Sequence, residues 1–241
     1  MIYSSVHNEK IKQLSRLNNK KDRDEQNLFL VEGDHLIIEA SKNNLLKEII
    51  LLDGYNIDIN VPKIIVTENV MKFISNLKTA PNIIGVCTKK QSSNIGNKVL
   101  IIDNIQDPGN LGTIIRSSVA FNVDTIIMSK DTVDIYNSKV IRASQGMIFN
   151  INFIIDDLEK RIKQLKKDGY KILATDVNNG KTLNSLENIQ KVAIIMGNEG
   201  NGVSQNLKDL SDEFLYINMN KSCESLNVAV ATSIILYELS K

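Results

Sequence analysis

Five short, uninterrupted apolar runs in the second half of the chain constrain its fold more than any other feature. They are residues 99–102, 125–128, 171–174, 192–196 and 214–217. A strand buried on both faces needs such continuous runs, and both faces are buried in a parallel sheet that helices cover. The segments that would supply those helices are residues 111–121, 138–149, 158–169 and 226–239. We therefore predict an α/β fold with an open parallel sheet, flanked by helices, for residues 99–241.

The first 95 residues predict a smaller α/β unit. A polar helix and a loop come first, followed by the strand, turn and helix of FLVEGDHLIIEASKNN. The remaining elements expected here, three strands and one helix, lie at residues 47–52, 63–66, 83–88 and 69–76. The polar stretch KKQSSNIGNK, residues 89–98, lacks apolar periodicity and is the best linker candidate. We therefore expect two domains, residues 1–95 and residues 96–241.

The charge balance excludes a protein that binds nucleic acid by bulk charge alone. The chain has 29 Lys and Arg residues against 28 Asp and Glu, a net charge of +1. A histone-like binder, which neutralises many phosphates, would have a large positive excess. Basic residues are nevertheless concentrated at the start of the chain: Lys10, Lys12, Arg16, Lys20, Lys21 and Arg23. We expect a local basic arm there.

Cysteine, histidine and apolar content point to a cytoplasmic protein without a metal site. Cys87 and Cys223 are isolated and form no CxxC pair, which disfavours a disulfide framework or a zinc ribbon. With His7 and His35 as its two histidines, the chain offers little for a histidine-based metal site. The amino terminus lacks the apolar core of a signal peptide, and no apolar run approaches the roughly 20 residues that cross a bilayer.

The first of three candidate functional clusters is NIQDPGNLGTIIRSS, residues 104–118, directly after an expected strand. Ligands of an open parallel sheet bind at the carboxyl ends of the strands. A Pro–Gly pair predicts a tight turn, and Asn110 can cap a helix that starts at Leu111. Arg116 would then lie nearly two turns into that helix. A plain corner with a surface arginine explains the spacing equally well, and a Walker A loop is excluded because its lysine is missing.

The second cluster is MGNEGNGVS, residues 196–204, which follows the run VAIIM. Three glycines within six residues can expose backbone N–H and C=O groups to a ligand. The spacing is GxxGxG rather than GxGxxG, so the dinucleotide-binding fingerprint is absent. Glu199 could bind a hydroxyl or an amine in such a loop, or it could be a solvated carboxylate in a simple turn.

The third cluster is INMNKSCESLNVAVATSIILYEL, residues 217–239. Here an expected strand leads through a polar loop into a helix, for which Ser225 is a plausible N-cap. The small side chains of Ala229, Ala231 and Ser233 permit close helix packing. A capped core helix explains these features but leaves the polar Asn227 unexplained.

Taken together and in this order, DPGNLGTIIR, IMGNEGNGVS and SLNVAVATSIILYE resemble the three motifs of the SpoU (TrmH-type) RNA 2'-O-ribose methyltransferases of the SPOUT class. The first 95 residues, with Arg16, Arg23 and FLVEGDHLIIEA, resemble the ribosomal-protein-like substrate-binding domain of the rRNA-directed members. The resemblance implies an α/β-knot, in which the carboxy-terminal segment passes through a deep trefoil knot. It also implies a homodimer whose interface includes the carboxy-terminal helix.

The resemblance further implies a methyl transfer from S-adenosylmethionine (SAM) to the 2'-hydroxyl of a ribose, with 23S ribosomal RNA as the expected substrate. Residues expected at the cofactor are Met196, Gly197, Ile217, Met219 and Leu226. Residues expected on the acceptor side are Asn110, Arg116, Glu199, Ser225 and Asn227. RNA-binding residues expected in the first domain are Lys12, Arg16, Lys20, Lys21 and Arg23. No metal is expected.

Arg116 has two possible roles in that reaction. The family casts this arginine as the base, but a guanidinium stays protonated at neutral pH and is a poor base. A fixed positive charge beside the 2'-oxygen would instead stabilise the developing alkoxide and position the nucleotide.

Three other functions remain as alternatives at this point. The same chemistry could act on tRNA, although the tRNA-specific relatives usually lack this type of amino-terminal domain. A catalytically inactive dimer that binds ribosomal RNA is disfavoured by polar residues at all five acceptor-side positions. A nucleotide-dependent oxidoreductase is disfavoured because the glycine spacing is wrong for it.

Overall fold

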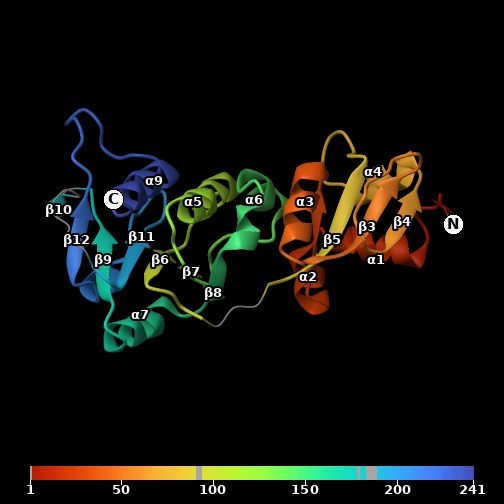
Figure 1. The fold of residues 1–241 in the computed structure, drawn as a ribbon. Coiled ribbons are helices and arrows are strands. Elements are labelled where there is room, and N and C mark those ends of the chain that lie inside the picture. Colours follow the sequence, from red (N-terminus) through yellow and green to blue (C-terminus); the bar gives the residue numbers. More distant parts are fainter. Residues whose placement is uncertain (1, 91–93, 178–179, 183–188) are drawn as a thin grey trace. The chain divides into compact units, whose positions relative to one another are not determined.

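The computed structural model describes residues 2–90, 94–177, 180–182 and 189–241. The chain forms two compact units, shown in Figure 1. Unit 1 combines Met1–Lys90 with Asp134–Asn150, and unit 2 combines Gln91–Val133 with Ile151–Lys241. The domain boundary near residue 95 stays a prediction, but the inclusion of residues 134–150 in unit 1 was not expected from the sequence.

Unit 1 is built on a five-stranded sheet with the order β1-β4-β3-β5-β2. Its strands are β1 (Ile2–Tyr3), β2 (Leu28–Glu32), β3 (Leu46–Leu52), β4 (Lys63–Val66) and β5 (Ile83–Thr88). β1, β4 and β3 run parallel, whereas β5 is antiparallel to both β3 and β2. The helical segments are α1 (Glu9–Arg16), α2 (Lys20–Gln26), α3 (Asp34–Lys42), α4 (Glu68–Ile74), α6 (Ser138–Ala143) and the 3-10 helix η1 (Met147–Asn150).

The amino-terminal segment forms two helices, where the sequence predicted one helix and a loop. α1 ends after Arg16, and Asn19 takes an extended backbone conformation before α2 begins. Ile11 and Leu14 of α1 are buried in a core that also contains Ile50 and Ile84 of the sheet. Two apolar residues per helix face suffice to dock so short a helix, because tertiary packing supplies most helical stability.

Unit 2 contains a seven-stranded sheet in which every pair of neighbouring described strands is parallel, with the order β10-β12-β9-β11-β6-β7-β8. Its strands are β6 (Lys98–Ile102), β7 (Thr125–Met128), β8 (Asn152–Ile155), β9 (Lys171–Thr175), β10 (Lys181–Thr182), β11 (Val192–Met196) and β12 (Glu213–Tyr216). The five apolar runs thus correspond to five strands, which confirms the predicted parallel sheet. β8 and β10 were missed because each lies at a sheet edge and neither is fully buried.

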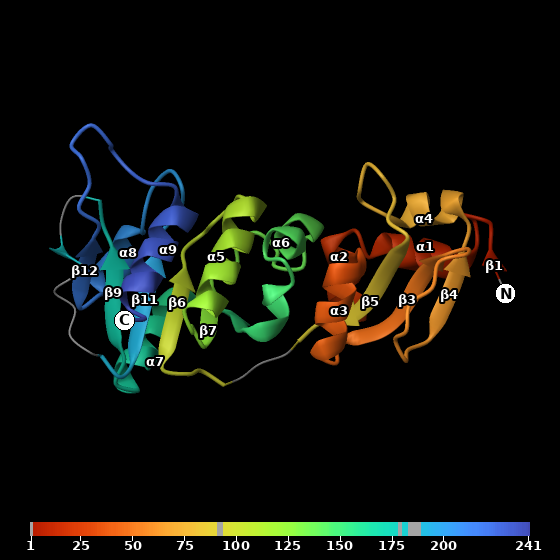
Figure 2. The same ribbon diagram turned by 45° about the horizontal axis from the view of Figure 1, so that its top comes forward.

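Helices cover both faces of this sheet. They are α5 (Pro108–Ala120), α7 (Leu158–Lys167), α8 (Gln205–Asp209) and α9 (Val228–Glu238). α7 and α8 pack on the face that presents Val99, Ile101 and Ile195. α5 and α9 lie side by side, as Figure 2 shows, and are joined by a hydrogen bond of 2.7 Å between the hydroxyl groups of Ser117 and Ser233.

Two predicted helix starts were wrong by a few residues, and side-chain capping explains both. α5 begins at Pro108 rather than Leu111, because Asp107 caps it by accepting a hydrogen bond from the backbone N–H of Asn110. α9 begins at Val228, and its N-cap is Asn227 rather than Ser225. The polar Asn227 is thus explained.

The helix predicted over residues 138–149 is interrupted. α6 ends at Ala143, Gln145 and Gly146 have φ angles of 52° and 80°, and η1 follows. A left-handed pair of residues ends an α-helix, and glycine adopts this conformation without the usual steric cost. The trefoil knot implied by the family resemblance stays a prediction. No helix within the described ranges is both long and apolar enough to span a bilayer.

Candidate active site

A cavity of about 600 Å³ opens in unit 2 at the carboxyl ends of β9, β11 and β12. Three segments provide most of its wall: residues 175–177, residues 196–203 and the chain between Ile217 and Ala231. The residues that the sequence placed at the cofactor all line it: Met196, Gly197, Ile217, Met219 and Leu226. The second and third clusters meet at this cavity because both follow parallel strands, whose carboxyl ends lie at the same edge of the sheet.

The glycine-rich loop after β11 is a narrow turn whose backbone faces the cavity. Asn198 and Gly202 exchange two backbone hydrogen bonds of 3.0 Å, and the Asn198 side-chain oxygen accepts from Gly200 N at 2.9 Å. A Cβ atom on Gly197 would lie 2.0 Å from the carbonyl carbon of Gly202 and 2.1 Å from Val203 N. The loop can therefore close only with glycine at position 197.

Glu199 joins this loop to the first cluster. Its carboxylate accepts hydrogen bonds from Gln106 N at 3.4 Å and from Asp107 N at 3.2 Å. The side-chain amide of Asn110 donates to the same carboxylate at 3.1 Å. Glu199 is exposed, but it is not a simple turn residue, because its carboxylate oxygens hold the loop before α5.

An uninterrupted chain of hydrogen bonds connects all three clusters through two amides. The Asn110 Nδ2 donates to Glu199, and the Asn110 Oδ1 accepts from Asn227 Nδ2 at 3.0 Å. Asn227 Oδ1 in turn accepts from Ala229 N at 2.9 Å, within the cap of α9. A carboxylate only accepts and a backbone N–H only donates, so both amide orientations are determined. Each amide nitrogen retains a second N–H that can donate to a ligand.

The electrostatics of Glu199 follow from these contacts. Burial of the carboxylate by itself raises the pKa of Glu199, but the hydrogen bonds from Asn110, Asp107 and Gln106 stabilise the charged form. The net result is a pKa below the ordinary value. The carboxylate therefore stays ionised and accepts all of these hydrogen bonds at neutral pH.

Replacing Glu199 with Gln is expected to make folding stability less dependent on pH in the acid range. Because the pKa is lowered in the folded state, the carboxylate contributes stability above the unfolded value of about 4.3. That contribution is lost as the pH falls through the folded pKa. Urea unfolding should show the stability difference between wild type and Glu199→Gln shrinking from about pH 7 to about pH 3.5. A difference that stays constant would contradict the assignment.

The other two acceptor-side residues lie at the surface of unit 2. Arg116 is exposed on α5 and makes no hydrogen bond or ion pair with a described residue. On α5, Arg116 lies nearly two turns after Asn110. Ser225 lines the cavity and is exposed, and its carbonyl oxygen lies 3.2 Å from the Cys223 sulfur, which donates to it.

The basic residues predicted to bind RNA differ in their surroundings within unit 1. Arg16 and Lys20 are exposed and form no ion pair with a described residue, whereas Lys12 pairs with Glu9 and Lys21 with Glu25.

Arg23 does not fit the prediction that it binds RNA. Its side chain is only 7% exposed and forms an ion pair of 2.6 Å with Asp134. Its guanidinium also donates to the carbonyl groups of Leu17 and Asn18 at 2.9 and 2.8 Å. Burial and these contacts keep its guanidinium inside unit 1, where a phosphate cannot reach it without breaking the ion pair, and we exclude it from the RNA-binding set.

Two residues at the cavity, Asn198 and Asp176, were not identified from the sequence. Asn198 holds the glycine loop and donates to Asn104 O at 2.7 Å. Asp176, which follows β9 and lines the cavity, forms an ion pair of 2.7 Å with Lys208. The rule that ligands lie at strand carboxyl ends would have pointed to Asp176. In the described part of the chain, no cluster of three His, Cys, Asp or Glu side chains could hold a metal ion.

Comparison with known proteins gives two family matches. The model of the SpoU rRNA methylase family matches residues 97–237, and that of the MRM3-like substrate binding domain matches residues 8–85. The 23S rRNA (guanosine(2553)-2'-O)-methyltransferase RlmP of Bacillus subtilis (strain 168) is 35% identical to this chain over 241 residues. The alignment covers 98% of this chain and 97% of that protein.

Solved structures agree with this result. The AdoMet-bound rRNA methyltransferase from Sinorhizobium meliloti has a TM-score of 0.88 and 26% identity, covering 99% of this chain and 97% of its own. A structure described as an RNA 2'-O ribose methyltransferase has a TM-score of 0.84 and 25% identity, covering 99% and 98%. The family resemblance of the three clusters is thus confirmed. The family model matches more than half of the chain, and a relative is 35% identical along nearly all of it. The chain therefore belongs to the SpoU rRNA methylase family.

Proposed function

We propose that this protein transfers a methyl group from SAM to the 2'-hydroxyl of a ribose in 23S ribosomal RNA. The observation that supports it most strongly is the joining of all three motifs into one hydrogen-bonded site beside the cavity. The relative from Bacillus subtilis, which aligns along nearly its whole length and whose name describes this reaction, supports the same substrate. Ribosomal RNA would place the enzyme in the cytoplasm.

The cavity fits SAM in size and in chemistry. Its volume of about 600 Å³ lies in the usual range for small-molecule sites. Ile217, Met219 and Leu226 offer apolar edges to an adenine ring, and the close turn at Gly197 presents backbone donors and acceptors. When bound there, SAM would supply a methyl group already activated by its sulfonium charge.

On the acceptor side, the residues of this chain would orient the ribose and stabilise charge. Asn110 and Asn227 would donate their free N–H groups to the nucleotide, while Glu199 keeps both amides in place. Ser225 would add a hydroxyl at the edge of the cavity. The guanidinium of Arg116, which no described residue pairs with, would stabilise the alkoxide that develops on the 2'-oxygen and bind the adjoining phosphate.

Unit 1 would bind the RNA through its basic residues. Among the described residues, Arg16 and Lys20 have no ion-pair partner, and Lys12 and Lys21 pair with nearby glutamates that a phosphate can replace. The match to a substrate binding domain over residues 8–85 supports this role. This substrate-binding domain also favours ribosomal RNA over tRNA as the substrate, because tRNA-specific relatives usually lack an amino-terminal domain of this type.

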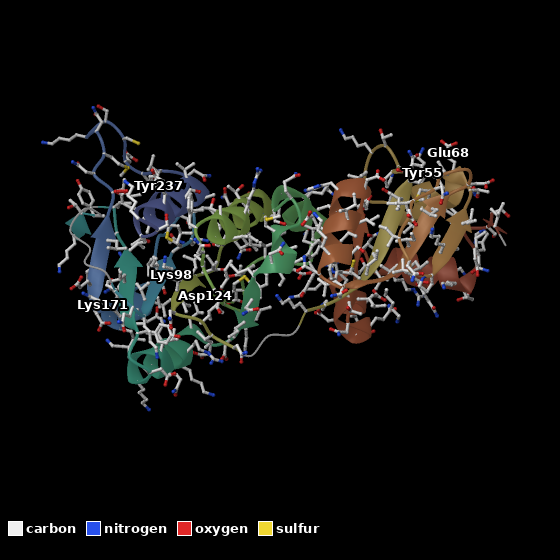
Figure 3. The ribbon with its side chains drawn as sticks, in the orientation of Figure 1. Tyr55, Glu68, Lys98, Asp124, Lys171 and Tyr237 are labelled. Atoms are coloured by element: carbon white, nitrogen blue, oxygen red, sulfur yellow. The ribbon has the colours of Figure 1, made fainter. Side chains whose placement is uncertain are left out.

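A homodimer through α9 is part of the proposal. Val230, Ile234 and Tyr237 are 49%, 38% and 53% exposed and recur at helical spacing, so they form one apolar stripe. Figure 3 labels Tyr237 on this helix. An exposed apolar stripe on the last helix suits a second copy of the same chain, because a two-fold interface pairs a surface with itself.

Replacing Ile234 with Glu is expected to convert the dimer to a monomer, because a charge in the middle of the stripe would be buried without a partner. Analytical ultracentrifugation measures the change directly. Ile155→Glu is the matched control, since Ile155 is 57% exposed on β8, away from α9. A dimer that persists in Ile234→Glu, or that is lost equally in Ile155→Glu, would contradict the α9 interface.

The function is tested with purified protein, SAM and unmodified RNA. We expect 2'-O-methylated nucleosides to appear, by mass spectrometry of digested RNA, with 23S RNA and not with tRNA. Methylation confined to tRNA would contradict the proposed substrate but support the proposed reaction. Failure to bind SAM in calorimetry would favour the inactive RNA-binding dimer instead.

A further inference from the structure

The wall of the cavity contains an ion pair that belongs to none of the three motif clusters. Lys208 on α8 donates to Asp176, which directly follows β9, at 2.7 Å between Nζ and Oδ2. The two side chains are 24% and 17% exposed, and both residues line the cavity within unit 2. An ion pair largely removed from water adds little to stability, because desolvation offsets the attraction. Its place in the wall therefore favours a role in binding the ligand.

The backbone at Asp176 is held on both sides. Its N–H donates to Leu215 O of β12 at 2.9 Å. The hydroxyl group of the preceding residue, Thr175, donates to Ile195 O of β11 at 3.0 Å. The carboxylate thus has a defined position before a ligand arrives, and a preorganised group binds without a further ordering cost.

The position of Asp176 in the sheet indicates which part of SAM it would meet. Neighbouring strands follow the order β12-β9-β11-β6, as Figure 1 shows. The contacts of Glu199 join the loops after β11 and β6, whereas the apolar Ile217 and Met219 follow β12. In the proposed function, the methyl group lies on the side of Glu199 and the adenine lies against the apolar edge. The ribose of SAM, which joins these two parts, would lie over the end of β9.

We propose that Asp176 accepts hydrogen bonds from the ribose hydroxyl groups of SAM and that Lys208 is a positioning residue for its carboxylate. This inference rests on the proposed function. A carboxylate has about four acceptor positions, so its pair with Lys208 does not prevent hydroxyl groups from donating to it. Hydrogen bonds to an ionised carboxylate are about twice as strong as those between neutral groups. Lys208, which has only donors, holds the carboxylate and offsets its charge.

Asp176→Asn removes the negative charge and keeps the size of the side chain. We expect the Kd for SAM, measured by calorimetry, to rise by about ten- to a hundredfold. Asp212→Asn is the matched control, because Asp212 also forms an ion pair of 2.7 Å, with Lys166, and is not among the described residues that line the cavity. At a comparable change in thermal stability, the control should bind SAM within about twofold of wild type.

Two nucleosides identify the group that Asp176 binds. 5'-Methylthioadenosine contains the adenine and ribose of SAM without its amino acid, and the 2',3'-dideoxy form of this nucleoside also lacks the ribose hydroxyl groups. Asp176→Asn should weaken the binding of 5'-methylthioadenosine by the same factor as that of SAM. The affinity for the dideoxy form should stay within about twofold of wild type.

Two variants of Lys208 test its positioning role. Lys208→Arg keeps the positive charge and should bind SAM within about twofold of wild type. Lys208→Gln should raise the Kd by about threefold to tenfold, because the carboxylate loses the group that holds it. Equal losses of affinity in these two variants would overturn the role of Lys208.

Four results would overturn the role of Asp176. Two of them are wild-type affinity for SAM in Asp176→Asn and an equal loss of affinity in Asp212→Asn. Unchanged binding of 5'-methylthioadenosine by Asp176→Asn would place the ion pair at the amino acid of SAM instead. Equal weakening of the dideoxy form would place it at the adenine. Failure of the wild-type protein to bind SAM would instead overturn the proposed function.

Discussion

Arg116→Ala is expected to lower the rate of methyl transfer by about a hundred- to a thousandfold, the usual loss when one charge-stabilising donor is removed. The guanidinium is exposed on α5 and unpaired among the described residues, so its removal breaks no internal contact. Folding and the Kd for SAM should therefore be unchanged. Single-turnover kinetics with saturating RNA and calorimetry with SAM measure the two quantities separately.

Arg116→Lys distinguishes how the arginine works. If positive charge suffices, this variant should retain most of the activity, whereas near-total loss would show that planar, bidentate geometry is needed. Arg161→Ala is the control, because Arg161 lies on α7 and pairs with Asp156. Full activity of Arg116→Ala would remove Arg116 from the mechanism.

Gly197→Ala is expected to raise the Kd for SAM by about ten- to a hundredfold, with a loss of stability of about 1–3 kcal/mol. The added Cβ would overlap Gly202 and Val203 at 2.0 and 2.1 Å, both through backbone atoms that cannot rotate away. The turn would have to open, and its backbone groups would leave the cavity.

Gly200→Ala provides a closely matched control in the same loop. A Cβ there would lie 3.6 Å from the Asn198 side-chain oxygen, which is an ordinary van der Waals contact. Calorimetry should show wild-type affinity for SAM in this variant. Equal affinity in Gly197→Ala and Gly200→Ala would mean that the turn does not form the cofactor site.

Much of unit 2 could be predicted because its strands are buried on both faces. Residues 192–196 are apolar throughout and form a fully buried strand, as a central parallel strand must. The edge strands β8 and β10 give no such signal, since Ile155 is exposed and β10 is two residues long. Burial on both faces, rather than β propensity, made the central strands recognisable.

The sequence predicted residues that line the cavity, but not the contacts between them. Glycine spacing suggested a ligand loop, yet the bond from Glu199 to the loop before α5 joins residues about ninety positions apart. Local sequence does not encode such a pairing. The same limit explains the wrong prediction for Arg23. Its partner Asp134 lies 111 residues away, so the sequence showed a basic residue but not that it is buried in an ion pair.

The central claim is that this protein methylates a ribose of 23S ribosomal RNA, and nucleotide-resolution mapping of 2'-O-methyl groups tests it most directly. The RNA is taken from three kinds of cells: cells that contain the protein, cells that lack it, and cells that contain the Arg116→Ala variant in its place. We expect one 2'-O-methyl group in 23S RNA to disappear without the protein and to stay absent with the variant. An unchanged 23S RNA, or restoration of the mark by Arg116→Ala, would contradict the claim.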